Sequence, residues 1–154
     1  MLDPFTFYSR IISATMGMAD TAQRASETLV ASRDVINRRT AMMGEAVFSP
    51  LDGNYAEFGK MIPEKVEAFG KAGAAIANDW WAIQSTFLTE AQHFGAIVMK
   101  GRAPTFSELS ALSKRNTAFA LRTFERAAAI SAGGLMPIHA SATANAKRLM
   151  AIAA

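Results

Sequence analysis

The feature that most constrains this chain is a row of apolar residues that recurs every three and four positions between Val66 and Ile97. A repeat that averages 3.5 residues and lasts for more than four heptads places its members on one side of a long helix. Only Gly73 and Glu90 interrupt the row. The other eight positions, which we call the heptad stripe, are Val66, Phe69, Ile76, Trp80, Ile83, Phe87, Phe94 and Ile97. Such a stripe must lie against another helix, another chain or an apolar surface.

Composition favours helices throughout the chain. Of the 154 residues, 51% are hydrophobic, and many of these are Ala and Met, whereas runs of β-branched residues are scarce. We therefore expect an all-α protein whose long amphipathic helices form a helical bundle or a coiled-coil oligomer. The length suits one domain. We expect a single helical domain over residues 1–154, with a long helix and a turn in residues 1–55 and a second region in residues 60–154.

Two long helices are expected in the first two thirds of the chain. Pro4, preceded by an aspartate, favours a helix start, and no proline follows until position 50, so the first helix runs to about Val47. The second helix carries the heptad stripe, begins at Pro63 and ends at Gly101. Residues 55–62 fit either a short helix or a loop.

Two further helices are expected near the C-terminal end of the sequence. Thr105 and Glu108 have the spacing of a capping box, which begins a third helix. That helix is expected to stop at Gly133 and Gly134, because glycine lowers helix propensity. Pro137 then opens a short fourth helix.

The adjacent Trp80 and Trp81 admit two interpretations. Consecutive helical residues point roughly 100° apart, so only Trp80 belongs to the stripe. In the first interpretation Trp80 is a core residue and Trp81 packs against a flanking helix. In the second, one or both rings anchor the protein on an apolar or interfacial surface.

No motif predicts catalysis, cofactor binding or a metal site. The only histidines are His93 and His139, cysteine is absent, and no metal-binding histidine spacing occurs. The small residues from Gly70 to Ala75 lie within a helical pattern and do not complete a phosphate-binding loop. We interpret them as a place where another helix or surface comes close. We therefore expect no enzyme activity, no cofactor, and no catalytic, cofactor-binding or metal-binding residues.

The positive charge is concentrated in the last third of the chain. The net charge is +3, and residues 105–154 carry six basic and two acidic residues. Four of the basic residues recur at helical spacing: Lys114, Arg115, Arg122 and Arg126. This pattern fits a solvated helix face, or contact with anionic headgroups or nucleic acid. The excess is small for a nucleic-acid-binding protein, so we expect no specific nucleic-acid partner.

The sequence also suggests where the protein resides. No secretory signal is evident at the start, and the absence of cysteine fits a reducing compartment. Residues 127–146 lack Asp, Glu, Lys and Arg, but glycine, proline and asparagine interrupt them, so we expect no transmembrane segment. These observations predict a cytoplasmic protein.

Three segments, in this order, resemble the phasins of alphaproteobacteria. They are residues 62–69 (IPEKVEAF) with 72–75 (AGAA), residues 102–105 (RAPT), and residues 136–139 (MPIH) with 143–149 (TANAKRL). Phasins are small, helical, amphipathic proteins that coat intracellular polyhydroxyalkanoate granules. The resemblance covers roughly residues 60–150. It implies a granule coat without enzymatic activity, located at the surface of storage granules, with contacts to the polymer synthase or depolymerase.

The leading functional hypothesis is therefore an amphipathic coat protein of polyhydroxyalkanoate granules. The heptad stripe would contact the polymer or mediate homo-oligomerisation, since an exposed stripe of this length is a large apolar patch for a monomer. The alternative is a helical oligomeric scaffold or regulatory interaction protein in which the stripe is permanently buried.

Overall fold

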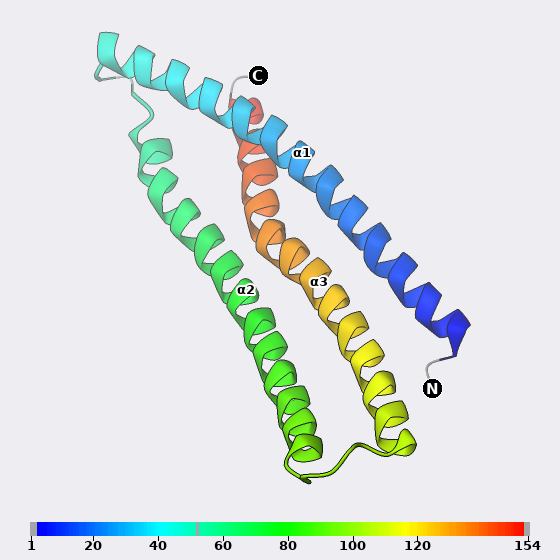
Figure 1. Ribbon diagram of the computed structural model, residues 1–154. Coiled ribbons are helices and arrows are strands. Elements are labelled where there is room, and N and C mark those ends of the chain that lie inside the picture. Colours follow the sequence, from blue (N-terminus) through cyan, green and yellow to red (C-terminus); the bar gives the residue numbers. More distant parts are fainter. Residues whose placement is uncertain (1–2, 52, 153–154) are drawn as a thin grey trace. The chain divides into compact units, whose positions relative to one another are not determined.

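A computed structural model describes residues 3–51 and 53–152 of the chain, and these residues form three long helices (Figure 1). Helix α1 comprises Pro4–Phe48, α2 comprises Tyr55–Val98 and α3 comprises Phe106–Ile152. No β-strand occurs within these described ranges. The prediction of an all-α fold built from long amphipathic helices is confirmed.

The chain divides into two compact units, and each unit contains a segment of all three helices. Unit 1 is formed by Met1–Ala19 and Ile76–Ala132, and unit 2 by Asp20–Ala75 and Gly133–Ala154. Each unit is thus a small bundle in which three helix segments pack together. The expectation of a single helical domain over the whole chain stays a prediction.

Two of the predicted helix ends are confirmed by their hydrogen bonds. The Asp3 carboxylate accepts from the backbone N–H groups of Phe5 and Thr6, both at 3.1 Å, which satisfies free donors in the first turn of α1. At the start of α3, the Thr105 N–H donates to Glu108 Oε2 at 2.8 Å, and the Glu108 N–H donates to Thr105 Oγ1 at 3.3 Å. This reciprocal pair is the expected capping box.

The predicted start of the second helix was wrong. Helix α2 begins at Tyr55 and continues through Pro63. Asn54 caps this earlier start, because its Oδ1 accepts from the N–H of Glu57 at 3.1 Å. The Glu57 side chain is also held by two arginines from the other helices of unit 2, so tertiary contacts stabilise a first turn that its own sequence leaves ambiguous.

The predicted break between a third and a fourth helix was also wrong, because α3 is continuous through Pro137. Proline in a helix removes one hydrogen bond and crowds the carbonyl four residues earlier. That earlier residue is Gly133, and the corresponding residue for Pro63 is Gly59. Glycine has the greatest backbone freedom, so it can adjust to the ring with little strain. The two helices therefore tolerate prolines that the sequence alone would place at their ends.

The buried core of unit 2 joins α1 to α3. A cluster of four buried side chains forms its centre: Ala31, Val35, Ala146 and Leu149. From α2, Ala68 and Ala72 are also buried. A methyl group added to Gly133 would lie 3.4 Å from Ala75, whereas nothing lies within 4 Å of Gly70 or Gly73. The small residues of α2 therefore allow a close approach at alanines, and within this chain not at the two glycines.

Unit 1 has a thinner core. Its fully buried hydrophobic side chains in the described residues are Leu121 and Ala128, both on α3. Phe87 of α2 and Phe119 of α3 contact each other with ring centroids 6.5 Å apart. Most of the large apolar side chains of this unit remain open to solvent.

Candidate functional site

The heptad stripe consists of two rows with different exposure. In the first row, Val66, Trp80, Phe87 and Phe94 are all more than half exposed. In the second row, Phe69 and Ile76 are exposed, whereas Ile83 and Ile97 are partly buried. The structure therefore does not bury the stripe within the chain: six of its eight residues are exposed.

Helix α2 places its charges toward α3 in unit 1. Residues 76–98 contain only two charged side chains, Asp79 and Glu90. Asp79 accepts from Arg126 at 2.7 Å, and Glu90 accepts from Arg115 at 2.9 Å. Both acceptors are mostly covered, with 22% and 14% of the side chain exposed. Both carboxylates of this segment thus form ion pairs with arginines of α3 within unit 1.

An adjoining arc of this segment carries large apolar side chains, one of which, Phe87, also contacts Phe119 of α3. We call it the outer face of α2; it is formed by Trp80, Trp81, Phe87, Leu88, Phe94 and Val98. These six side chains are between 55% and 72% exposed. At about 100° per residue they cover a continuous arc of the helix, interrupted only by small or neutral residues. Segment 76–98 therefore presents an apolar, uncharged face to solvent.

The first interpretation of the tryptophan pair was wrong for the isolated chain. Trp80 is 55% exposed and is not a core residue, and Trp81 is 72% exposed and does not pack beneath another helix. The heptad stripe contains only Trp80 of this pair. It missed Trp81, Leu88 and Val98, which become evident only when the paired carboxylates show which side of α2 faces inward.

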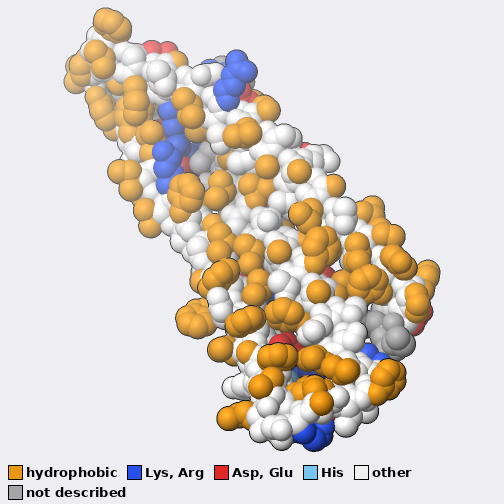
Figure 2. Space-filling model, viewed as in Figure 1, with side chains coloured by type: hydrophobic (Ala, Val, Ile, Leu, Met, Phe, Trp, Pro, Cys, Tyr) orange, Lys and Arg blue, Asp and Glu red, His pale blue; other side chains and the backbone are white. Residues whose placement is uncertain are grey.

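Other segments of unit 1 add to its exposed apolar area. On α1, the exposed residues include Phe5, Tyr8, Ile12 and Met16, and on α3 they include Phe106, Leu109 and Phe124. Figure 2 shows hydrophobic side chains over much of the face in view. In unit 1 as a whole, eight aromatic side chains are exposed, against three in unit 2.

The histidines show no metal site. His139 Nδ1 lies 3.1 Å from Thr28 Oγ1, and its Nε2 lies 3.7 Å from Glu27, so this ring is held in contacts between α1 and α3. No cluster of three or more metal-ligating side chains occurs in residues 3–51 and 53–152. Over the same ranges, no helix has a stretch long and apolar enough to cross a bilayer.

The predicted basic face on α3 is largely an ion-pairing face. Arg115 and Arg122 both contact Glu90, the latter at 3.4 Å, and Arg126 contacts Asp79. Lys114 has no ion pair in the part of the chain that the structure describes. Three of the four basic residues therefore neutralise carboxylates of α2, which favours the interpretation as a solvated, structural face.

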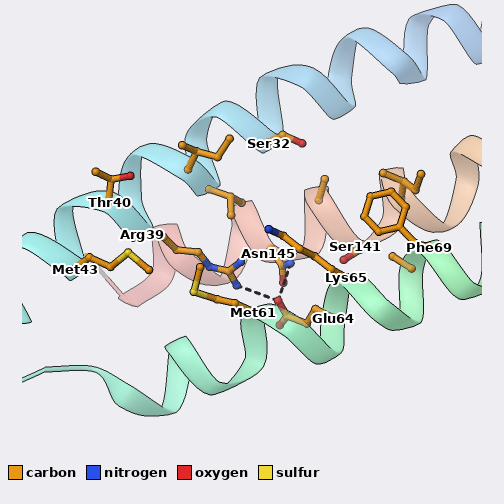
Figure 3. Close-up of a pocket in the computed structure, with 15 residues that line it drawn as sticks. Ser32, Arg39, Thr40, Met43, Met61, Glu64, Lys65, Phe69, Ser141 and Asn145 are labelled. Carbon is orange, nitrogen blue, oxygen red and sulfur yellow. Dashed lines mark hydrogen bonds and ion pairs between the residues drawn. The ribbon is translucent and has the colours of Figure 1, made fainter.

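An ion-pair network that the sequence did not reveal joins the three helices of unit 2. Figure 3 shows the part of it that Arg39, Glu64 and Asn145 form. Arg39 of α1 and Arg148 of α3 each donate to both Glu57 and Glu64 of α2, over 2.7 to 2.9 Å. Asn145 Nδ2 donates to Glu64 at 3.0 Å. Arg39 and Glu57 are 5% and 2% exposed. Two positive and two negative charges thus balance in a site where Arg39 and Glu57 are buried and Arg148 and Glu64 are partly exposed.

The network holds its carboxylates in the ionised form. Burial alone would raise the pKa of Glu57 and of Glu64, but hydrogen bonds from Arg39 and Arg148 lower both pKa values below the ordinary 4.5. A carboxyl whose pKa is lower in the folded state stabilises the fold above its unfolded-state pKa. That stabilisation is lost as the pH falls through the folded-state value.

We therefore expect the free energy of unfolding to fall as the pH drops below about 4.5, because the network must then be protonated. Urea denaturation followed by circular dichroism between pH 7 and pH 2 measures this. The double substitution Glu57→Gln and Glu64→Gln should flatten the profile. Glu67→Gln removes only an exposed pair with Lys71, which also lowers the pKa of Glu67, and should change the slope much less than the double substitution does. Equal slopes in the double variant and the wild type would contradict the assignment.

No protein-family model matches this chain, and no curated protein or solved structure shows significant similarity to it. The observations that bear on function are therefore the residues described above and the resemblance of three sequence segments to phasins.

Proposed function

We propose that this protein is a non-enzymatic coat protein that adsorbs to the surface of intracellular polyhydroxyalkanoate granules. The observation that carries the proposal is the outer face of α2, where six large apolar side chains are exposed while the charges of the same segment pair with α3. This arrangement suits a water-insoluble, uncharged surface better than an anionic membrane or nucleic acid.

The energetics support adsorption through this face. Full burial of a large apolar side chain contributes about 1.5–3 kcal/mol. Because the side chains of the outer face are more than half exposed, each could still contribute roughly 1 kcal/mol or more on contact with an apolar surface. Six such contacts acting together would contribute roughly 6 kcal/mol or more, which is comparable with the lower part of the range of about 4–15 kcal/mol for the cost of association.

The resemblance to phasins is what supports polyhydroxyalkanoate as the polymer, which physical reasoning alone does not name. The segments at residues 62–69, 102–105 and 136–149 occur in the order found in that family. By the same resemblance, the polymer synthase or depolymerase are proposed partners. The proposed location is the cytoplasm, at the granule surface.

Imaging in cells tests the proposal directly. A fluorescent fusion should form rings or foci on granules in cells that accumulate the polymer, and should be diffuse in cells unable to make it. A fusion carrying Trp80→Gln and Phe87→Gln should stay diffuse in both. Diffuse wild-type fluorescence in polymer-rich cells would contradict the proposal.

The second candidate is a helical oligomeric scaffold, and the same exposed stripe favours it. An apolar patch of this extent is unusual on a monomer. If a partner copy covers the stripe permanently, the protein should be a stable oligomer at micromolar concentration and should not adsorb to polyester.

For self-association, we expect that replacing Ile76 and Ile83 with aspartate shifts the sedimentation distribution toward the monomer, because two buried charges would oppose an apolar interface. Analytical ultracentrifugation over a range of concentrations measures this. Lys114→Gln, which alters an unpaired surface charge, serves as the control. A wild-type protein that stays monomeric at high concentration would exclude the scaffold.

A further inference from the structure

Unit 2 contains a half-open pocket of about 320 Å³ that the proposed coat function does not use. All three helices line it, and Figure 3 shows the lining side chains. Eight of the fifteen lining residues are apolar, and the six largest of these are Val35, Ile36, Met43, Met61, Phe69 and Ile138. Hydroxyl groups from Ser32, Thr40 and Ser141 lie among them. An apolar pocket with a few polar groups is typical of a small-molecule site.

The charged groups at the pocket leave one positive charge uncompensated. Arg39 and Arg148 balance Glu57 and Glu64 in the ion-pair network. Lys65 also lines the pocket and has no ion pair or hydrogen bond among the described residues. The pocket therefore has a net charge of +1, which complements a ligand with a single negative charge.

Arg39 is the second positively charged residue that lines the pocket. Only 5% of this residue is exposed to solvent. Its two hydrogen bonds both come from Nη2, and its Nε has no partner. Within residues 3–51 and 53–152 its Nη1 has none either. In Figure 3 the Arg39 guanidinium and the Lys65 side chain extend toward the same region beside Asn145.

We propose that this pocket binds a monocarboxylate with a flexible apolar chain. The carboxylate lies between Lys65 and Arg39, and the chain lies along Met43, Met61 and Phe69. At about 30 Å³ for each water-sized group, the volume holds roughly ten non-hydrogen atoms. A medium-chain fatty acid has this size. The carboxylate end of a short hydroxyalkanoate oligomer has a similar size. This second source of the ligand rests on the proposed granule function.

Methionine methyl groups report on this site without reference to activity. In ¹³C-methyl-methionine NMR, titration with decanoate should shift the signals of Met43 and Met61 to saturation with one dissociation constant. Met16 and Met99 are exposed in unit 1, and their signals should not shift in parallel. An absence of shifts at the pocket methionines, or equal non-saturating shifts at all four, would overturn the proposal.

Substitution of the unpaired lysine tests the charge argument. Lys65→Gln should weaken decanoate binding roughly tenfold, because it removes a charge-assisted contact. It should not change the weaker binding of decan-1-ol, which has no carboxylate. Lys60→Gln is the matched control, since Lys60 is exposed on the same helix and does not line the pocket. Unchanged decanoate affinity in Lys65→Gln would exclude the proposed site.

Parallel titrations distinguish the source of the ligand. Decanoate and the linear dimer of 3-hydroxybutyrate have similar sizes, and the methyl ester of the dimer lacks the charge. Tighter binding of the dimer than of decanoate, with loss of affinity in the ester, assigns the site to polyester chain ends. Preference for decanoate assigns it to fatty acids. Lys65→Gln should still adsorb to polyester particles, and Trp80→Gln with Phe87→Gln should still bind decanoate, so the two proposals fail separately.

Discussion

Replacing both Trp80 and Phe87 with glutamine is expected to weaken adsorption to polyester particles by roughly 10- to 150-fold. Each side chain is 55% exposed in the free chain, so about half of its burial energy remains available. Half of the usual 1.5–3 kcal/mol for each side chain gives about 1.5–3 kcal/mol for the pair, and each 1.4 kcal/mol is a factor of ten. Co-sedimentation with particles over a range of protein concentrations measures the change.

Salt and two control variants separate apolar adsorption from charge-driven adsorption. Binding should persist at high ionic strength, since salt screens exposed charges and does not weaken apolar burial. Phe48→Gln removes an exposed aromatic of unit 2 that lies off the outer face, and Lys114→Gln removes an unpaired charge. Neither should matter. Adsorption that disappears in salt, or that depends on Lys114 and not on the aromatics, would favour a basic contact surface instead.

The second large effect concerns stability. Arg39→Ala should lower the free energy of unfolding by about 3–5 kcal/mol, because it leaves the buried Glu57 without one of its two partners. Urea denaturation followed by circular dichroism at pH 7 gives the value. Lys71→Ala breaks only the exposed pair with Glu67 and should cost less than about 1 kcal/mol.

A compensating pair of substitutions shows whether the loss comes from an unpaired charge. Arg39→Met combined with Glu57→Leu removes one charge of each sign and should restore much of the stability, since apolar residues of similar size can replace a buried ion pair. If Arg39→Ala costs no more than Lys71→Ala, the network is not a stabilising element of unit 2.

The sequence predicted the helical class well and its interruptions poorly. The capping box at Thr105 and the start at Pro4 depend on neighbouring residues, so local chemistry was enough. The sequence pattern predicts helix starts at Pro63 and Pro137, because proline is common at the first position of a helix. Both helices continue through these prolines, because a glycine stands four residues before each one and distant segments pack against the helix. A local sequence pattern does not include those tertiary contacts.

The heptad stripe predicted three of the six residues of the outer face and missed Trp81, Leu88 and Val98, again because tertiary contacts are not visible in a local pattern. Heptad spacing shows which residues share one side of a helix, but not which side faces a partner. Only the pairing of Asp79 and Glu90 with arginines of α3 shows that charge lies inward and the tryptophans outward. The ion-pair network joins Arg39 to Arg148, and the pocket is lined by residues of all three helices. These residues are too distant in sequence for any periodicity to connect them.

The division of each helix between two units determines the order in which a growing chain can complete them. The last residue of unit 1 is Ala132, whereas the network of unit 2 waits for Arg148 and its core for Leu149. At about 5–20 residues per second, the last residues of unit 2 are synthesised roughly 1–3 s after those of unit 1. Nascent chains of increasing length, arrested behind a C-terminal linker that spans the ribosomal exit tunnel, should become protease-resistant in unit 1 first. The unit that carries most of the exposed aromatic side chains would then be the first to fold.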